Sequence, residues 1–169
     1  MKKTLIAITL IAVFTLTACG KKADTAGRPA DSPSPSATST VSNGFGVPIT
    51  VGTAITLTIS KPASFKPGTF ASNYLPGQAA NEFSVTLKNG TTAPLDPATI
   101  SLVASSGANT CTDVLDGDNN ISGAPTDPIA AGSEAKFKFA IGCDAKSGDP
   151  LHIDITIGTD TSALDGKIA

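Results

Sequence analysis

Residues 151–157 read Leu-His-Ile-Asp-Ile-Thr-Ile, a strict alternation of aliphatic and polar side chains. Successive side chains of a β-strand point to opposite faces, so this period of two predicts a strand with one buried face. Residues 55–59, 82–88 and 134–141 alternate in the same way. A fifth strand is expected at 99–104, where Val103 on the second face suggests cover on both sides, and a short sixth at 111–115.

Turn-forming residues separate these segments at intervals of about ten residues, and none of the segments has helical spacing. The fold class predicted is therefore all-β, an immunoglobulin-like antiparallel β-sandwich of about six to eight strands. The turn signals are Lys61-Pro62, Pro67-Gly68, Pro76-Gly77, Asn89-Gly90, Asp96-Pro97, Asp127-Pro128 and Asp149-Pro150.

The first 18 residues have the parts of a secretory signal peptide. Lys2 and Lys3 precede an apolar stretch from Leu5 to Leu16, and small residues follow it. A membrane-spanning helix needs about 20 apolar residues, and this stretch is shorter and interrupted by threonines. We therefore expect residues 1–18 to be removed on export.

The run Leu16-Thr17-Ala18-Cys19 resembles a bacterial lipobox. This resemblance implies cleavage before Cys19 and attachment of diacylglyceryl and acyl (palmitate-type) lipid to that cysteine, with no other cofactor expected. Two or more acyl chains hold a protein stably on a bilayer. The membrane would thus be bound through the lipid anchor, with the protein on the outer face of the cell membrane, exposed to the cell wall or the extracellular side.

Residues 19–47 are rich in Ser, Pro and Thr and lack apolar periodicity. Such a segment buries too little apolar surface to offset the entropy of ordering it, so we expect a disordered tether after the lipidated cysteine. Residues 48–169 would then form the sandwich domain.

Cys111 and Cys143 remain once Cys19 is assigned to the lipid. They are either two free thiols or a disulfide bond, and an even number of remaining cysteines in an exported domain favours the disulfide.

Several segments of the domain, from about residue 47 to 159, resemble the telokin-like immunoglobulin-fold domain of lipoproteins from actinobacteria and other Gram-positive bacteria, and of small secreted mycobacterial antigens. The resemblance implies the same fold and brings no catalytic residues with it. The segments are Ile55 to Pro62, Phe65 with Pro67-Gly68, Glu82 to Gly90, Pro94-Leu95, Pro128 to Gly132 and Lys136 to Phe139.

The acidic loop after residue 115 has some of the spacing of a calcium loop. Ile121, however, occupies the sixth place, where the sharp turn requires glycine, and helical flanks are not predicted. A solvated polar loop is the favoured interpretation, with no metal. The weak metal candidates are Asp116, Asp118, Asn120 and Asp127.

Phe65, Phe70 and Tyr74 lie in a long connection rather than on an alternating strand. They either line a ligand or partner groove or plug the open end of the sandwich.

The remaining residues do not predict an enzyme. Ser133 and Lys136 match a Ser-x-x-Lys nucleophile motif, but on a strand these positions point to opposite sides. The sole histidine, His152, lies on the polar side of its strand. From residue 45 onward seven Lys face twelve Asp or Glu, a net charge of −5 that disfavours nucleic acid.

The predicted function is a non-catalytic interaction module that binds an envelope or extracellular protein. The alternative is a small-ligand or calcium-binding accessory lipoprotein for a transporter or sensor.

Overall fold

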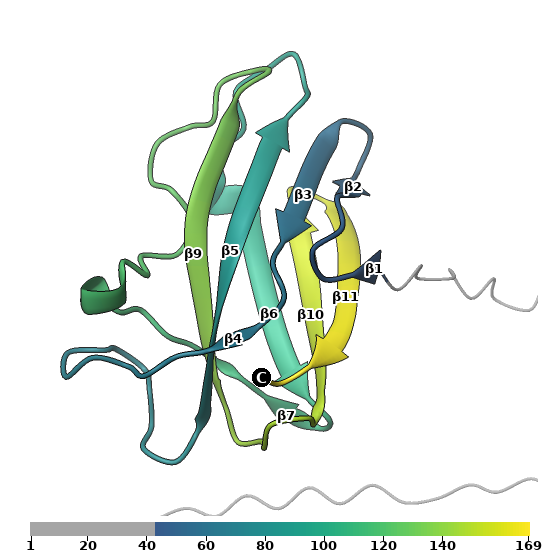
Figure 1. Cartoon of the computed structure of the whole chain (residues 1–169). Coiled ribbons are helices and arrows are strands. Elements are labelled where there is room, and N and C mark those ends of the chain that lie inside the picture. Colours follow the sequence, from purple (N-terminus) through teal and green to yellow (C-terminus); the bar gives the residue numbers. More distant parts are fainter. Residues whose placement is uncertain (1–42) are drawn as a thin grey trace, which may run out of the picture. The chain divides into compact units, whose positions relative to one another are not determined.

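The computed structural model describes residues 43–169, which fold into two facing β-sheets (Figure 1). The predicted signal peptide 1–18, the lipidation site Cys19 and most of the predicted tether lie outside the described residues. Within 43–169 no helix has the length and apolar character needed to cross a bilayer.

The first sheet has the strand order β1-β11-β10-β6-β7, and the second has the order β2-β3-β5-β9-β8 with β4 paired to β5. Every pairing is antiparallel except that of β1 with β11. In chain order the strands are β1 Asn43–Gly44, β2 Ile49–Val51, β3 Ile55–Ile59, β4 Ala63–Ser64, β5 Ala79–Asn89, β6 Ile100–Ser106, β7 Asn109–Thr110, β8 Thr112–Asp113, β9 Glu134–Cys143, β10 Pro150–Ile157 and β11 Asp160–Lys167, with short 3-10 turns η1 Pro97–Thr99 and η2 Gly117–Asn119.

The alternating aliphatic residues form the core between the sheets. Leu87, Ile141, Ile153 and Ile155 are completely buried. Burying such a side chain contributes about 1.5–3 kcal/mol, so the alternating strands supply much of the driving force for folding.

Three phenylalanines extend the core toward the N-terminal strand. The ring of Phe83 lies 5.7 Å from that of Phe45 and 5.8 Å from that of Phe139, between ring centres. Gly46 then donates its backbone N–H to Ile59 of β3 at 2.7 Å. The chain therefore contacts both sheets within a few residues of its first strand.

The sandwich predicted from sequence is confirmed, and seven of the strands in residues 43–169 have three or more residues. The fifth predicted strand is β6, but Val103 is 49% exposed, so the expected cover on its second face is wrong. The sixth predicted segment contains only the two-residue β8. Strand pairing begins at Asn43, inside the range 19–47 assigned to the tether.

Candidate functional site: a groove between two strand edges

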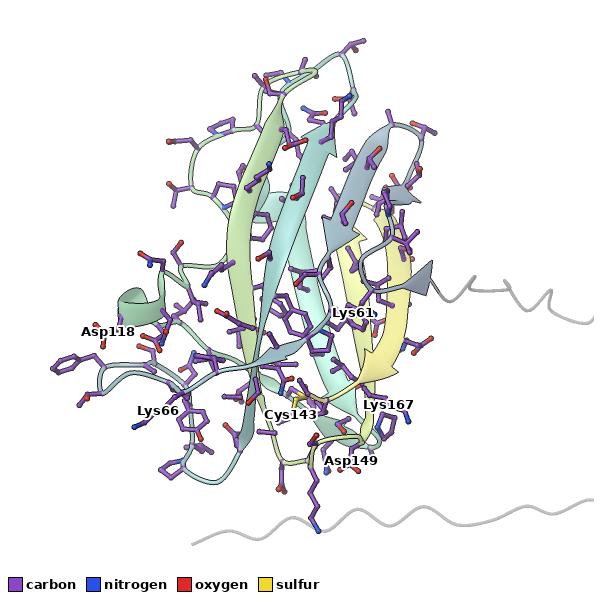
Figure 2. The ribbon with its side chains drawn as sticks, in the orientation of Figure 1. Lys61, Lys66, Asp118, Cys143, Asp149 and Lys167 are labelled. Atoms are coloured by element: carbon purple, nitrogen blue, oxygen red, sulfur yellow. A yellow bond between two sulfur atoms is a disulfide. The ribbon has the colours of Figure 1, made fainter. Side chains whose placement is uncertain are left out.

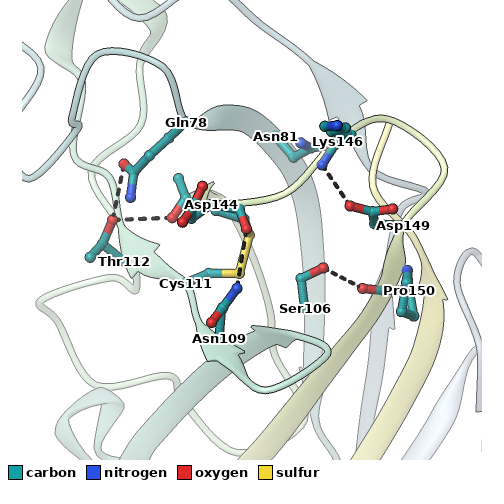
Figure 3. Close-up of a disulfide and its surroundings, with 12 residues drawn as sticks. Gln78, Asn81, Ser106, Asn109, Cys111, Thr112, Asp144, Lys146, Asp149 and Pro150 are labelled. Carbon is teal, nitrogen blue, oxygen red and sulfur yellow. Dashed lines mark hydrogen bonds between the residues drawn. A yellow bond between two sulfur atoms is a disulfide. The ribbon is translucent and has the colours of Figure 1, made fainter.

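Cys111 and Cys143 form a disulfide, as the sequence predicted, with an S–S distance of 2.05 Å and a Cα–Cα distance of 4.4 Å (Figure 3). Both cysteines are buried. The bond ties the β7–β8 connection to the end of β9, where Thr112 Oγ1 also donates to the carbonyl of Gly142 at 3.2 Å.

The chain crosses from one sheet to the other at this disulfide. Cys111 donates its backbone N–H to Ala104 of β6 at 2.9 Å, and the next two residues form β8 on the edge of the second sheet. The edges of β6 and β8 are thus connected through Cys111, and a groove lies between them.

Two adjoining cavities make up this groove, which we call the edge groove. One has a volume of about 390 Å³ and the other about 220 Å³, and both are lined by Leu102, Val103 and Asp113. Leu75 and Asn73 from the loop after β4 line the first, while Leu115, Ala124 and Phe139 help to line the second.

The rim of the edge groove carries exposed aliphatic side chains. Val103 is 49% exposed, Leu75 61% and Leu115 45%. Among residues 43–169 the other exposed large hydrophobic side chains are Val47 and Phe70. Isolated exposed apolar residues are ordinary, but a cluster around one concave surface is typical of a binding site.

Asp113 supplies the charge of the edge groove. It pairs with the buried Ile141 across β8 and β9, so its side chain lies on the inner side of the sheet, toward the groove. Burial raises the pKa of this carboxyl group, because the ionised form loses part of its hydration. Among the described residues that line the two cavities, Asp113 alone carries a charged side chain.

The acidic loop proposed from sequence as a weak calcium site is organised by Asp116, which is 2% exposed. Its carboxylate accepts hydrogen bonds from the backbone N–H of Gly68 at 2.7 Å, from Asn119 Nδ2 at 2.8 Å and from the N–H of Asp118 at 3.0 Å. These bonds lower the pKa of Asp116, the bond from Gly68 most of all.

Among the other weak metal candidates, Asp118 lies beside Asp116, because its N–H donates to the Asp116 carboxylate. Asp118 lies on η2 near the loop that carries Lys66 (Figure 2), Asn120 ends η2 in a left-handed conformation, and Asp127 lies beyond Ser122 in the following loop. Across residues 43–169 no three His, Cys, Asp or Glu side chains are grouped so that they could hold a metal ion.

The three loop aromatics have different environments. Phe65 and Tyr74 are half-buried and pack against a small second core formed by Val114, Ile121 and Ala140. Phe70 is 86% exposed. Two of the three aromatics therefore support the loops on the outer face of the second sheet, and none of them lines the edge groove.

A separate polar groove of about 540 Å³ lies on the outer face of β5 and β9, lined partly by Thr86, Lys136 and Lys138. Both lysines already have acidic partners: Lys138 Nζ lies 2.9 Å from Glu82 Oε2, and Lys136 Nζ lies 3.3 Å from Glu134 Oε1. The polar groove therefore has less uncompensated charge than the edge groove, and none of the exposed large hydrophobic side chains of residues 43–169 lines it.

His152 lies on the solvent face of β10, where the sequence placed it. Its Nδ1 is 2.6 Å from Asp165 Oδ1 and its Nε2 is 3.2 Å from Asp154 Oδ1. The hydrogen bond to Asp165 is the largest cause of a raised His152 pKa, and Asp154 adds to it. None of these three residues lines either groove, although Asp154 pairs across the strands with Val103 at the rim of the edge groove.

Sequence reasoning missed the edge groove. Leu75 lies in a loop, and the short strand predicted at 111–115 did not indicate a site, so the only available signal was Val103, an aliphatic residue on the second face of a strand.

No protein-family model matches the sequence, and no curated protein matches it. Among solved structures, a candidate lipoprotein (YcdA) of Bacillus subtilis matches with a TM-score of 0.57 and 12% identity, covering 70% of this chain and 38% of that one. An uncharacterised β-sandwich protein of Clostridium difficile has a TM-score of 0.46 at 15% identity, covering 72% of this chain and 90% of its own. A FixG-related protein of Vibrio parahaemolyticus has a TM-score of 0.45 at 10% identity, covering 69% and 96%. The chain thus spans 38% of the Bacillus protein's length. At these identities the likenesses concern the fold alone, and that fold is the all-β sandwich seen in residues 43–169.

Proposed function

We propose that this protein is a lipid-anchored, non-catalytic interaction module on the outer face of the cell membrane, and that its sandwich binds another protein of the envelope or the extracellular side. The edge groove is the observation that carries this proposal. Its rim places Leu75, Val103 and Leu115 around one concave surface. Protein-binding sites typically combine such an apolar centre with a polar rim.

The small number of exposed aliphatic side chains at the groove fits a partner that binds transiently. Some transient protein interfaces bury less than about 1,200 Å² in total, and a groove with three aliphatic side chains at its rim can form the apolar centre of such a contact. The disulfide supports the same interpretation, because it fixes the end of the groove where β6 meets β8. A rigid site costs less entropy on binding.

The anchor is supported by the lipobox-like run ending at Cys19. The likeness of the fold to a candidate lipoprotein of Bacillus subtilis agrees with it. Assignment to the telokin-like domains of Gram-positive lipoproteins is the finer part of the proposal, and it rests on the sequence segments given above. The net charge of −5 in the folded domain favours a protein over nucleic acid as the partner.

Cell fractionation of the wild type and Cys19→Ser tests the anchor. We expect the wild type to sediment with the membrane and to carry labelled fatty acid, and the variant to do neither. An unchanged membrane-bound fraction for Cys19→Ser would contradict lipidation at this residue.

Chemical cross-linking in the native envelope, followed by recovery of the tagged protein, tests the interaction. The wild type should recover one protein reproducibly, and the mature soluble domain added in excess should compete with it. Absence of any competed cross-link would count against an interaction module.

A further inference from the structure

One wall of the edge groove, β6, is a strand edge that lacks a neighbouring strand along most of its length within residues 43–169. Within the described residues β6 pairs with β10 along Ile100–Ser105, whereas on its other side it pairs with β7 only at Ser105 and Ser106. The other wall, β8, pairs with β9, and just beyond it Leu115 forms an antiparallel bridge with Ser72 on the side away from β9. The groove therefore exposes an unpaired backbone edge on β6, from Ile100 to Val103.

Backbone hydrogen-bonding groups face this groove. Ala104 accepts the N–H of Cys111 on the side of β6 away from β10. Because strand backbone groups alternate in direction, the N–H and C=O of Leu102 point to the same side as those of Ala104. Val114 donates its N–H to Ala140 toward β9, so the backbone groups of the preceding residue, Asp113, point away from β9.

An extended peptide can pair with the free backbone N–H and C=O groups of such an edge. A strand added to a sheet forms main-chain hydrogen bonds along the edge, and its alternate side chains enter pockets on one face. Ile100 to Val103 offers about 13 Å of free edge at roughly 3.3 Å per residue, which is enough for a segment of about four residues. Leu75, Val103 and Leu115 would contact aliphatic side chains of that segment.

Asp113 decides which extended segment fits. A carboxylate that points inward at an unpaired edge disfavours uncharged or acidic strands, because they would bury the charge without a partner. A segment with a lysine or arginine at the facing position compensates the carboxylate, so the same residue that blocks most strands selects one class.

The alternative occupant is a second copy of this chain. β6 and β8 contain no basic residue, since they read Ile-Ser-Leu-Val-Ala-Ser-Ser and Thr-Asp. Pairing of two identical edges would bring two Asp113 carboxylates into one groove with no cation supplied by either edge. Charge therefore favours a different protein.

We propose that the edge groove accepts an extended segment of a partner protein, which adds as a strand to the free edge of β6 and places a lysine or arginine against Asp113. This inference rests on the proposed interaction function and specifies its partner.

Synthetic peptides test it with the mature domain. The probes are acetyl-Thr-Val-Thr-Lys-Thr-Val-Thr-amide, the same peptide with glutamate in place of lysine, and the lysine peptide with proline at both valines. Backbone amide shifts in two-dimensional NMR titrations report the binding. We expect saturable shifts centred on Leu102, Val103 and Asp113 for the lysine peptide, and weaker or no shifts for the other two.

Two variants separate the contribution of the Asp113 charge from a general effect of an Asp→Asn substitution. Asp113→Asn should bind the lysine peptide about tenfold more weakly and lose the preference over the glutamate peptide. Asp127→Asn, a matched change in an exposed loop, should bind like the wild type. Equal binding of the lysine and glutamate peptides by the wild type would overturn the role of Asp113, and binding by the proline peptide would overturn strand addition.

Failure of this inference can be distinguished from failure of the proposed function. If the envelope cross-link forms but none of the peptides shifts the groove amides, the edge-groove assignment is wrong and the interaction function stands. If neither the cross-link nor the peptide binding is observed, both are wrong.

Discussion

Removing the disulfide should destabilise the domain by an amount set by the length of chain it closes. Cys111 and Cys143 are 32 positions apart. On the chain-entropy description, a closed loop of about 33 residues contributes about 3.7 kcal/mol at 25 °C by restricting the unfolded chain. With an unfolding entropy of about 2.1 cal/mol/K per residue over roughly 127 residues, the melting temperature should fall by about 14 °C.

The variant that measures this is Cys111→Ala with Cys143→Ala, because alanine adds no buried hydroxyl at these buried positions. Urea unfolding followed by circular dichroism gives the free energy, and the oxidised wild type under the same conditions is the reference. We also expect a larger urea dependence for the variant, since its unfolded chain is less compact. A loss below about 1 kcal/mol would refute the loop-closure reasoning.

Three further predictions concern single residues. Asp116→Asn should lower the urea midpoint at neutral pH. Because the pKa of Asp116 is lowered, the difference from wild type should shrink as the pH falls below about 4. Measuring the urea midpoint of both proteins between pH 2 and 7 checks this. His152→Gln should cost under about 1 kcal/mol of stability, because the side chain is 41% exposed. Because the His152 pKa is raised, the loss should be largest below about pH 6.5 and should disappear at higher pH. Urea unfolding of both proteins across this pH range measures it, and a loss that grows with pH would contradict the prediction. Phe83→Ala, at a site 1% exposed between two other rings, should cost about 3–5 kcal/mol by thermal unfolding, and a cost near zero would contradict the packing described for this core.

The fold could be predicted where one face of a strand is buried and the other is wet. Residues 151–157 alternate perfectly because β10 lies in the middle of its sheet with one face on the core. β11 escaped prediction because Asp160–Lys167 reads Asp-Thr-Ser-Ala-Leu-Asp-Gly-Lys, with Leu164 as its only large aliphatic residue. Its conformation is set by continuous pairing with β10, which a local pattern does not contain.

The site could be predicted less well than the fold, because its residues meet through tertiary structure. Asp116 was only a weak metal candidate in a loop predicted to be solvated, yet it is buried, and its strongest partner, the N–H of Gly68, is 48 positions away in the sequence. Leu75 and Val103 come together only because the loop after β4 and the edge of β6 lie at the same side of the sandwich. The disulfide was predictable because counting cysteines requires no geometry.

The N-terminal end of the described domain has a mechanical consequence. A load applied at Asn43 reaches β11 through the parallel pairing of β1, then Phe83 through the stacked ring of Phe45, then β3 through the Gly46 N–H. Pulling from this end therefore strains both sheets together rather than peeling away one strand. For a module held at its N-terminal side, a load from a captured partner would be shared by both sheets, and forced unfolding of the domain would follow its unfolding rate rather than its equilibrium stability.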